Sequence, residues 1–425
     1  MKTVIMAGGK GTRISSVASD IPKPMIRLCG KPILEYQIVC LKKYQLTDII
    51  IVVGHLGHII KEHFGDGSSF GCSISYYTET EALGTAGALF KIVENLSDDF
   101  LLIHGDIIFD IDFSRFIEFH RVRNAWATLA VHPNSHPYDS ALLLTDEEHR
   151  VVTWLNKEDK RQYYKNQVNA GLHILSKEIL STVHPAADKV DLDRDILKPA
   201  LGSRRIFAYN TPEYIKDMGT PDRYAQVSAD IEQGIVGRRN LSVKQRAVFL
   251  DRDGTINTVK GYVTNPDSLE LIDGAAEAIQ RINSTGYLAI VITNQPVIAR
   301  GEASIEDLEH IHNKMEAELG RAGAYVDDIF FCPHHPDKGF PGEQPEYKID
   351  CDCRKPKPGM ILRAAEKYNI DLAQSYMVGD SLRDVGAGLA AGCTPVLMSP
   401  VIPARYTGLI FKDLREFTDT CIGTP

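Results

Sequence analysis

The chain has 425 residues, which exceeds the length over which one hydrophobic core keeps growing, so we expect two or three domains. Apolar residues make up 44% and charged residues 24% of the chain, proportions that are ordinary for a soluble globular enzyme. The net charge of −9, with no basic block to offset it, argues against a nucleic-acid-binding protein.

Targeting features and cysteine usage indicate the compartment. No apolar run is as long as a membrane span, and the N-terminus enters a strand pattern without the features of a signal peptide. We therefore expect a cytoplasmic protein without a membrane partner. Three of the eight cysteines, Cys332, Cys351 and Cys353, lie near histidines, which favours metal ligation in a reducing compartment over a disulfide framework.

Short runs rich in β-branched residues alternate with longer amphipathic stretches in the first half. We expect strands at residues 3–5, 49–53, 100–104, 127–131 and 168–175. This alternation is typical of α/β domains. Around residues 233–240 the pattern gives way to glycine and charge, and we place a linker there.

The alternation resumes after the linker. We expect strands at residues 247–250, 287–293, 328–331, 375–378 and 394–398, and helices at 305–319 and 357–368. The pattern predicts a mostly parallel sheet with helices on both faces. We therefore expect one α/β domain over residues 1–235 and a second over residues 246–425.

A glycine-rich loop follows the first predicted strand. Its glycines, Gly8, Gly9 and Gly11, allow backbone N–H groups to approach a triphosphate, and Thr12 lies in the same loop. Arg13 and Lys23 could supply countercharges. Taken alone, such a loop can also be an ordinary tight turn.

Five further motifs follow in order along the first half. They are Pro22-Lys23-Pro24-Met25, Leu83-Gly84-Thr85-Ala86-Gly87, Gly105-Asp106, Asn169-Ala170-Gly171 and Lys216-Asp217-Met218-Gly219-Thr220-Pro221. Together with the glycine loop they resemble the sugar-1-phosphate nucleotidylyltransferases, most closely those that activate mannose or heptose. The resemblance covers about residues 1–235 and implies a Rossmann-like mixed sheet.

The resemblance also implies roles for single residues. The sugar-1-phosphate oxygen would attack the α-phosphorus of a nucleoside triphosphate, with Arg13 on the departing pyrophosphate and Lys23 on the α-phosphate. Asp106 and Asp217 would hold Mg²⁺. Lys157 would bind the sugar phosphate and Asn169 the sugar hydroxyls. The usual Glu-Lys pair is replaced here by Asn156-Lys157.

Simpler interpretations stay open for some of these residues. Asp106 could cap a helix, and Lys157 could be a solvated loop charge. Glu79 and Glu81 precede Gly84, in the loop that should border the base, and a carboxylate there could accept from guanine N1–H and its exocyclic amine. We therefore expect GTP as the triphosphate, although these acids could equally be an exposed loop rim.

The second half opens with Phe249-Leu250-Asp251-Arg252-Asp253-Gly254-Thr255 at a predicted strand end. Two carboxylates one residue apart can divide phosphoryl transfer, with Asp251 as the nucleophile and Asp253 as the acid and then the base. Open α/β sheets bind ligands at the carboxyl ends of their strands, where these aspartates stand. The alternative is a polar turn after a strand.

Three further motifs complete a set of four. They are Thr293-Asn294-Gln295, Arg354-Lys355-Pro356 and Gly379-Asp380-Ser381, the last followed by Asp384. The set resembles the haloacid-dehalogenase phosphatases over about residues 246–420. The resemblance implies that Thr293 and Lys355 clamp the phosphoryl oxygens, and that Asp251, Asp380 and the Asp253 carbonyl hold Mg²⁺. Asn294 and Arg354 complete the expected sugar-phosphate contacts.

Three cysteines and a histidine flank a polar, proline-containing loop. Cys332, His334, Cys351 and Cys353 are four ligands of the kind that tetrahedral Zn²⁺ takes in closed, structural sites. Bound zinc would stiffen the loop that delivers Arg354 and Lys355. The neighbouring His335 is an alternative ligand.

Asn257, Gly261-Tyr262-Val263, Arg300-Gly301 and residues 353–360 resemble the heptose-1,7-bisphosphate 7-phosphatases and their histidinol-phosphatase relatives. Pro296-Val297-Ile298 departs from the small, glycine-containing run expected there. The two resemblances together imply a bifunctional, Mg²⁺-dependent enzyme that makes a nucleotide-activated heptose, GDP-D-glycero-α-D-manno-heptose. The alternatives are mannose-1-phosphate activation beside a histidinol-phosphate-type phosphatase, and a sugar-nucleotide binding or regulatory module.

Overall fold

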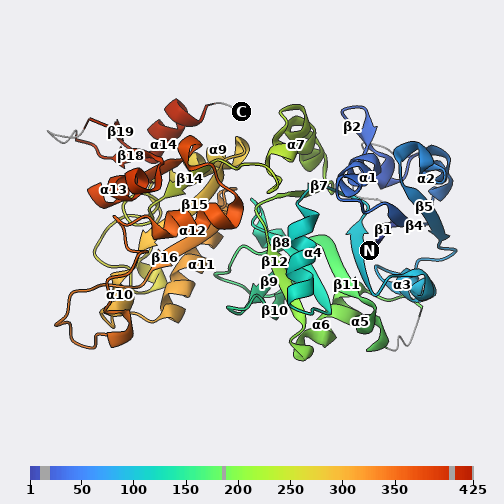
Figure 1. The fold of residues 1–425 in the computed structure, drawn as a ribbon, viewed down its shortest axis with the longest axis horizontal. Helices are drawn as coiled ribbons and strands as arrows, with labels where there is room; N and C mark the ends of the chain where they lie inside the picture. The colour runs from blue at the N-terminus through green and yellow to red at the C-terminus, as the bar shows by residue number, and fades with distance from the viewer. Residues whose placement is uncertain (10–19, 184–187, 402–406, 424–425) are drawn as a thin grey trace. The chain divides into compact units, whose positions relative to one another are not determined.

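The computed structural model describes residues 1–9, 20–183, 188–401 and 407–423. Contacts divide the chain into two compact units (Figure 1). The first contains residues 1–132, 143–155 and 168–240, and the second contains residues 133–142, 156–167 and 241–425. The division is therefore not a single cut in the sequence, and the expected domains at 1–235 and 246–425 stay a proposal. In the described part of the chain, no helix is long and apolar enough to cross a membrane.

A mixed nine-stranded sheet forms the centre of the first unit. Its central path runs in the order β10, β9, β11, β6, β1, β4, β5, and β8 and β12 continue from β11. The strands are β1 (Lys2–Ala7), β4 (Asp48–Val53), β5 (Ser73–Thr78), β6 (Asp99–His104), β8 (Ala127–His132), β9 (Leu142–Thr145), β10 (Val151–Leu155), β11 (Val168–Ser176) and β12 (Ile206–Asn210). The five strands expected from the sequence are present.

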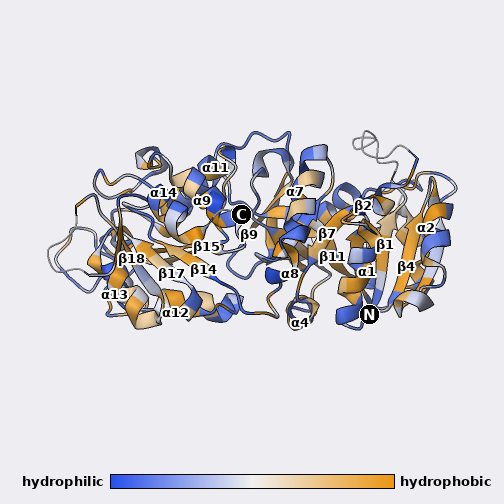
Figure 2. Ribbon diagram, turned by 90° about the horizontal axis from the view of Figure 1, so that it is seen from above, coloured by the Kyte–Doolittle hydropathy of each residue, from blue (hydrophilic) through white to orange (hydrophobic). Residues whose placement is uncertain are grey.

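Parallel pairing joins β6, β1, β4 and β5, whereas β11 runs antiparallel to both β6 and β8. Side chains of β1 and β4 form one apolar cluster with those of the helices α1 (Ile33–Lys43), α2 (Gly57–Phe64) and α4 (Phe113–Val122). Most residues of β1 and β4 are apolar because strands covered on both faces have little contact with water. Figure 2 shows this apolar centre.

A short antiparallel pair, β7 (Ile107–Asp110) with β13 (Tyr214–Asp217), lies beside this sheet. Its register places Asp217 opposite Ile107, and the Met218 N–H donates to the Asp106 carbonyl at 3.1 Å. Two motifs more than a hundred residues apart in sequence are thereby brought to neighbouring backbone positions.

Six parallel strands form the sheet of the second unit, in the order β16, β15, β14, β17, β18, β19. They are β14 (Ala247–Leu250), β15 (Leu288–Asn294), β16 (Asp328–Cys332), β17 (Tyr376–Gly379), β18 (Thr394–Met398) and β19 (Leu409–Phe411). The helices are α9 (Ala275–Ser284), α10 (Pro296–Ala299), α11 (Ile305–Arg321), α12 (Gly359–Tyr368), α13 (Leu382–Ala391) and α14 (Leu414–Phe417). The two-domain α/β fold class is confirmed.

Alternate residues of β14 point to opposite faces of the sheet. Val248 and Leu250 pack in a cluster with residues of α9 and α11, whereas Ala247 and Phe249 pack with residues of α12 and α13. The sheet is therefore doubly wound, and its polar groups collect at the carboxyl ends of the strands.

The expected linker is more ordered than its glycine and charge indicate. Residues Ile235–Arg238 form helix α8, and Arg239 and Asn240 are buried. Arg239 Nη1 donates to the Pro212 carbonyl at 2.9 Å, and Asn240 Nδ2 donates to Asp110 Oδ1 at 2.7 Å. These bonds pack the segment onto the first unit because buried polar groups need partners.

Candidate active sites

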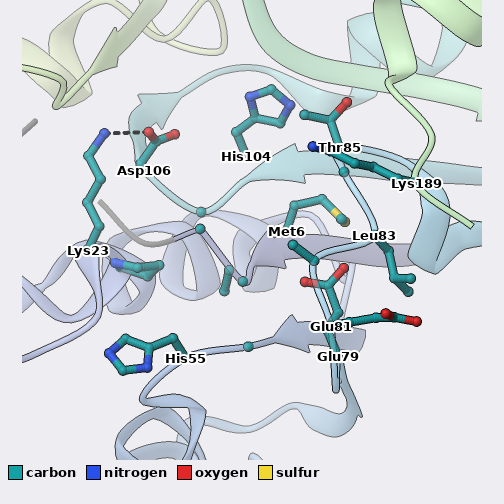
Figure 3. A pocket seen from close by; sticks show the side chains of 18 of the residues that line it. Met6, Lys23, His55, Glu79, Glu81, Leu83, Thr85, His104, Asp106 and Lys189 are labelled. Atoms are coloured by element: carbon teal, nitrogen blue, oxygen red, sulfur yellow. Dashed lines mark hydrogen bonds and ion pairs between the residues drawn. The ribbon is translucent and has the colours of Figure 1, made fainter. Parts of the chain in front are cut away.

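A cavity of about 820 Å³ lies in the first unit, at the carboxyl ends of β1, β4 and β6. It is lined by residues 6–9, 23–24, 54–55, 79–85 and 104–106 and by Lys189 (Figure 3). The volume is within the range of small-ligand pockets. Loops at strand ends form most of the lining.

The loop around Gly84 is held by a second chain segment. Gly84 has a φ of +83°, and a Cβ there would overlap the Val190 carbonyl oxygen, so only glycine fits. Ala86 N donates to the Val190 carbonyl at 3.0 Å, and Leu192 N donates to Thr85 Oγ1 at 2.7 Å. The loop edge of the cavity is therefore fixed before any ligand binds.

Lys23 and Asp106 form an ion pair in the cavity wall (Figure 3). Burial works against ionisation of the Asp106 carboxyl, but the Lys23 ammonium and His104 outweigh it and hold the pKa of Asp106 below its ordinary value. Asp217 is held by a different cation, since Arg223 Nη1 lies 2.9 and 2.8 Å from its two carboxylate oxygens. Each aspartate thus has its own countercharge.

Glu79 and Glu81 both line the cavity. The Oε1 atom of Glu79 is buried and has no hydrogen-bond partner among the described residues, and burial raises the pKa of Glu79. A Cβ added to Gly8 would overlap the Glu79 carboxylate, so the glycine loop and this acid are in close contact. Glu79 is thus a carboxylate of the cavity wall whose buried oxygen has no donor among the described residues.

The second site lies where β14, β15 and β17 of the second unit end. Asp251 follows β14, and its N–H donates to the Val378 carbonyl at 2.8 Å. Gly254 has a φ of +84°, and a Cβ there would overlap the Asp380 carboxylate. The turn after β14 therefore depends on glycine to bring Asp251 and Asp380 together.

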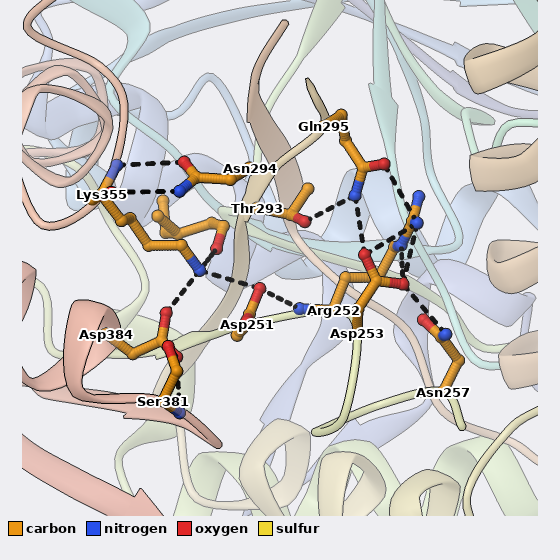
Figure 4. A network of polar contacts seen from close by, with 11 residues as sticks. Asp251, Arg252, Asp253, Asn257, Thr293, Asn294, Gln295, Lys355, Ser381 and Asp384 are labelled. Carbon is orange, nitrogen blue, oxygen red and sulfur yellow. Dashed lines mark hydrogen bonds and ion pairs between the residues drawn. The ribbon is translucent and has the colours of Figure 1, made fainter. Parts of the chain in front are cut away.

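Lys355 is the buried cation of this second site. Its Nζ lies 2.8 Å from Asp251 Oδ1 and 2.6 Å from Asp384 Oδ1, and it donates to the Ile292 carbonyl at 2.7 Å (Figure 4). Burial alone would lower the pKa of Lys355, but Asp251 and Asp384 raise it above its ordinary value. Lys355 is therefore charged and fixes both carboxylates.

Asp251, Asp380 and Asp384 each offer a carboxylate oxygen within 4.8 Å of the others. Burial and neighbouring Asp384 raise the pKa of Asp251 to about 7, although Lys355 opposes the shift. Burial and Asp384 also raise the pKa of Asp380. Three clustered carboxylates with one ammonium are short of positive charge, and oxygen ligands in such a cluster fit a hard divalent cation.

The carboxylate of Asp253 points away from this cluster and into a polar network (Figure 4). Arg252 Nη2 donates to its two oxygens at 2.8 and 2.9 Å, Asn257 Nδ2 donates to Oδ1 at 3.0 Å, and Gln295 Nε2 donates to Oδ2 at 2.9 Å. Burial opposes these contacts, but they prevail and lower the pKa of Asp253. Asp251 and Asp253 thus have opposite electrostatic surroundings, but both pKa shifts run against the expected roles. Bound Mg²⁺ at Asp251 and substrate phosphate beside Asp253 would have to reverse them before Asp251 attacks and Asp253 donates a proton.

Asn294 and Arg354 contact neighbouring backbone groups. Asn294 Nδ2 donates to the Lys355 carbonyl at 3.1 Å and its Oδ1 accepts from the Lys355 N–H at 3.0 Å, which fixes the Lys355 backbone. Arg354 Nη1 donates to the His334 carbonyl at 3.1 Å.

Cys332, His334, Cys351 and Cys353 converge at one point beside β16. Their ligand atoms all lie within 4.8 Å of one another, and Cys353 Sγ is 3.2 Å from both other sulfurs and 3.3 Å from His334 Nδ1. All eight cysteines of the chain are free thiols. His335 instead accepts a hydrogen bond from Asp337 N–H at 3.2 Å. The four groups fit a tetrahedral zinc ion, and His334 is the histidine among them.

A nucleotidyl transferase family model matches residues 2–234, which is more than half of the chain. The chain belongs to the nucleotidyl transferase family. This transferase resembles in fold a glucose-1-phosphate thymidylyltransferase structure from Bacillus anthracis, with 21% identity, a TM-score of 0.50, and coverage of 54% of this chain and 94% of that one. The ordered motifs of the first half predicted this family correctly.

The second half of this nucleotidyl transferase matches other proteins. A HAD-hydrolase-like model matches residues 352–399. A D-glycero-β-D-manno-heptose-1,7-bisphosphate 7-phosphatase of Yersinia pestis is 43% identical over 163 residues, covering 38% of this chain and 85% of the relative. The phosphatase of the same name from Escherichia coli K12 is 44% identical over 161 residues, covering 37% and 82%. The second half belongs to this phosphatase family, as its motifs predict.

The residues predicted for the transferase site fall into three groups. Gly8, Gly9, Lys23, Glu81, Gly84 and Asp106 line the cavity. Among the described residues, Lys157, Asn169 and Asp217 do not line it. The Lys157 side chain is 62% exposed and lies 3.7 Å from Glu158, while Asn169 accepts from Gly171 N–H at 3.3 Å. Gly11, Thr12 and Arg13 lie outside the described residues.

Several residues at the two sites have no predicted role. His104 and Lys189 line the transferase cavity; His104 directly precedes the Gly105-Asp106 motif, whereas Lys189 has no motif around it. Asp384 ion-pairs with Lys355, and Arg252 and Gln295 bind Asp253. Asp384, Arg252 and Gln295 lie in or beside the phosphatase motifs, and this position was the available signal. The motifs alone did not show which way these three side chains point.

Proposed function

We propose that the chain is a bifunctional enzyme that makes a nucleotide-activated heptose. Its second half removes the 7-phosphate of heptose 1,7-bisphosphate, and its first half couples the resulting heptose 1-phosphate to GMP from GTP, releasing pyrophosphate. The observation that carries the proposal is the Asp251–Lys355 pair at 2.8 Å beside Asp253, in the half whose relatives are named heptose-bisphosphate phosphatases. The product of one reaction is then the acceptor of the other.

In the phosphatase reaction, a carboxylate oxygen of Asp251 attacks the phosphorus, and the bond from phosphorus to the sugar oxygen breaks. Asp253 donates its proton to that oxygen as it leaves. Water then attacks the aspartyl-phosphate, Asp253 takes the water proton, and phosphate leaves Asp251 regenerated. Thr293 and Lys355 hold the phosphoryl oxygens, and Arg354 with Asn294 shapes the sugar-phosphate contacts.

We assign Mg²⁺ to the carboxylates of Asp251 and Asp380 and the carbonyl of Asp253. Bound Mg²⁺ would supply positive charge to the phosphoryl group. Support comes from the carboxylate cluster, which Asp384 joins, and from the raised pKa values of Asp251 and Asp380.

We assign structural Zn²⁺ to Cys332, His334, Cys351 and Cys353, because all four tetrahedral positions are protein atoms. The next residues in the chain are Arg354 and Lys355. A rigid zinc loop would therefore hold these two side chains at the phosphatase site. Reduced thiols and the use of a triphosphate donor support the proposal of a cytoplasmic enzyme.

In the transfer reaction, an oxygen of heptose 1-phosphate attacks the α-phosphorus of the triphosphate, and the bond to pyrophosphate breaks. Lys23 steadies the α-phosphate and Arg13 the pyrophosphate, while the loop of Gly8, Gly9, Gly11 and Thr12 binds the phosphates. Lys157 and Asn169 are assigned to the sugar phosphate.

Asp106 and Asp217 are assigned to Mg²⁺ at the transferase site. The Asp106–Lys23 and Asp217–Arg223 ion pairs would then have to open when metal and triphosphate bind. The Asp217–Arg223 pair is partly exposed and costs little to break. The Asp106–Lys23 pair is more buried, so metal and triphosphate would have to replace its contacts as it opens. The chemistry suits the metal, since carboxylate oxygens are hard ligands.

Guanine is the base that the acids of the cavity favour. Glu79 has an unpartnered, buried Oε1 atom in the cavity wall, and Glu81 lies two residues further along the same loop. A carboxylate accepts from both guanine N1–H and its exocyclic amine, whereas adenine offers a ring acceptor in place of that N1–H.

The experiment supplies the purified full chain with the α and β anomers of heptose 1,7-bisphosphate, and separately with histidinol phosphate. Phosphate release should be fastest with one heptose anomer. A parallel assay offers four triphosphates with heptose 1-phosphate and mannose 1-phosphate, and pyrophosphate should form best from GTP and heptose 1-phosphate. Hydrolysis of histidinol phosphate without hydrolysis of either heptose anomer would refute the proposal.

A further inference from the structure

Gln295 occupies the centre of the polar network behind the phosphatase site. The residue is 2% exposed, and its N–H donates to the carbonyl of Cys332, one of the proposed zinc ligands, at 2.8 Å, which fixes its backbone. The side-chain amide lies among Arg252, Asp253 and Thr293 (Figure 4). A buried amide with this many partners has a single hydrogen-bonding arrangement.

Arg252 determines which way the amide faces. Its Nη2 lies 3.2 Å from Gln295 Oε1, and a guanidinium can only donate, so the atom facing it must be the amide oxygen. The two hydrogens of Nε2 then go to Asp253 Oδ2 at 2.9 Å and to Thr293 Oγ1 at 2.8 Å. One amide group therefore connects Asp253, the proposed acid and base, to Thr293, which is expected to bind the phosphoryl oxygens.

Arg252 is itself positioned by a buried histidine. It is fully buried, and its Nη1 lies 3.3 Å from His312 Nε2, which must accept because the guanidinium has no acceptor. Burial, reinforced by Arg252, lowers the pKa of His312 well below its ordinary value, so the ring is neutral and can accept. The amide of Gln295 thus rests against a fixed donor.

The bond to Thr293 has a directional consequence. Because Thr293 Oγ1 accepts from Gln295, its own hydroxyl hydrogen is directed elsewhere and can donate to a phosphoryl oxygen. The bond to Asp253 leaves that carboxylate oriented by Gln295, Arg252 and Asn257 together. Loss of the amide hydrogens would release both groups.

We propose that Gln295 is a positioning residue that fixes the carboxylate of Asp253 relative to the hydroxyl of Thr293. The group that transfers the proton and the group that binds the phosphoryl oxygen are then both oriented for the same bound substrate. The inference rests on the proposed phosphatase activity. It requires that Gln295 donates two hydrogen bonds, not merely that it fills space.

Two substitutions remove the donors in different ways. Gln295→Glu keeps the oxygen that accepts from Arg252 but loses the amide hydrogens, and Gln295→Met keeps the approximate volume without polar atoms. Gln280→Glu, at an exposed position of α9, is the matched control for adding a carboxylate. Each protein is assayed with heptose 1,7-bisphosphate in the steady state and with p-nitrophenyl phosphate in the burst phase.

Both Gln295 variants should lower kcat for the sugar phosphate on the order of 10²-fold, the usual contribution of an oriented acid and base. The burst with p-nitrophenyl phosphate should fall less than about tenfold, because a good leaving group needs little help from an acid. The ratio of the two rates is measured on one preparation, so it does not depend on the fraction of folded protein. Gln280→Glu should leave both rates unchanged.

A Gln295→Met protein that retains kcat for the sugar phosphate within about threefold would overturn the inference. Equal losses with both substrates would also overturn it, since they would indicate a structural role alone. Absence of phosphate release by the unaltered protein from every sugar phosphate would instead refute the proposed function.

Discussion

Replacing Asp251 with asparagine should abolish phosphate release and, when Mg²⁺ is removed, make the second unit more stable. The reason is the cluster of Asp251, Asp380 and Asp384, whose carboxylate oxygens lie within 4.8 Å of one another, while the Lys355 ammonium pairs with Asp251 and Asp384. A site arranged to receive a divalent cation is electrostatically unfavourable without it.

The magnitude follows from the pKa of Asp251. Burial and Asp384 raise it from 3.8 to about 7, and each pKa unit is 1.36 kcal/mol, so ionised Asp251 costs the folded state roughly 4 kcal/mol. The amide loses part of the bond to Lys355, so we expect a net gain of roughly 2 to 4 kcal/mol. This corresponds to a rise in Tm of roughly 5 to 15 °C for a unit of this size.

The pH dependence has a definite sign. A carboxyl group whose pKa is raised on folding costs nothing below its unfolded value near 3.8 and its full amount above about 7. Without metal, the stability of the unaltered protein should therefore fall relative to the Asp251→Asn variant as the pH rises from 4 to 7. Mg²⁺ should stabilise the unaltered protein more than the variant.

Differential scanning calorimetry of protein dialysed free of Mg²⁺, at pH 5 and pH 8, with and without added Mg²⁺, measures these differences. No chelator is added, because it would also remove zinc. Asp267→Asn, at an exposed position of the same unit, is the matched control and should not move the transition. The reasoning is wrong if Asp251→Asn unfolds at a lower temperature than the unaltered protein at pH 8 without Mg²⁺.

Three further predictions concern zinc, a buried histidine and the base. The purified protein should hold about one zinc ion per chain by elemental analysis, and Cys353→Ser should lose it with a lower Tm while Cys393→Ser keeps it; equal zinc in both variants would contradict the assignment. Burial lowers the pKa of His173 to about 3, so the unfolded chain binds its proton below pH 6.5 and the folded chain does not. The free energy of unfolding should therefore fall by roughly 1.4 kcal/mol for each pH unit below about 6.5. Urea unfolding at pH 7 and pH 5 should show a smaller loss of this free energy for His173→Leu than for the unaltered protein, and an equal loss would contradict the assignment. Glu79→Gln should reduce the preference for GTP over ATP in kcat/KM by roughly tenfold or more, and an unchanged ratio would remove Glu79 from base recognition.

The sequence predicted the two sheets because their strands are nearly continuous apolar runs. Such runs report burial on both faces, which is what a covered sheet imposes. The approach of Asp251 to Asp380 was also predictable, since they directly follow β14 and β17 and parallel strands place their carboxyl ends together. The cluster of Cys332, His334, Cys351 and Cys353 was predictable from their ligand chemistry alone.

The sequence did not predict which way individual side chains point. Arg252 lies between the two aspartates of its motif, yet it is fully buried and binds Asp253, because the turn after β14 directs it inward. Asp384 and Lys355 are 29 residues apart and meet only when α13 packs beside the loop before α12. Lys189 reaches the transferase cavity from a segment without a recognisable motif.

The linker shows the limit of composition. Residues 233–240 contain glycine and arginine, which favour an exposed connection, but Arg239 and Asn240 are buried with satisfied hydrogen bonds. Long polar side chains can be buried when backbone carbonyls and a carboxylate are available to them. Composition does not report such tertiary partners.

The central claim is that two separate sites act in sequence on one sugar. The most direct measurement supplies the full chain with heptose 1,7-bisphosphate and GTP and follows phosphate, pyrophosphate and nucleotide-heptose together. The account predicts equal amounts of all three products, with phosphate release lost in Asp251→Asn and pyrophosphate release from heptose 1-phosphate lost in Lys23→Met. Loss of both activities in either folded variant would contradict it.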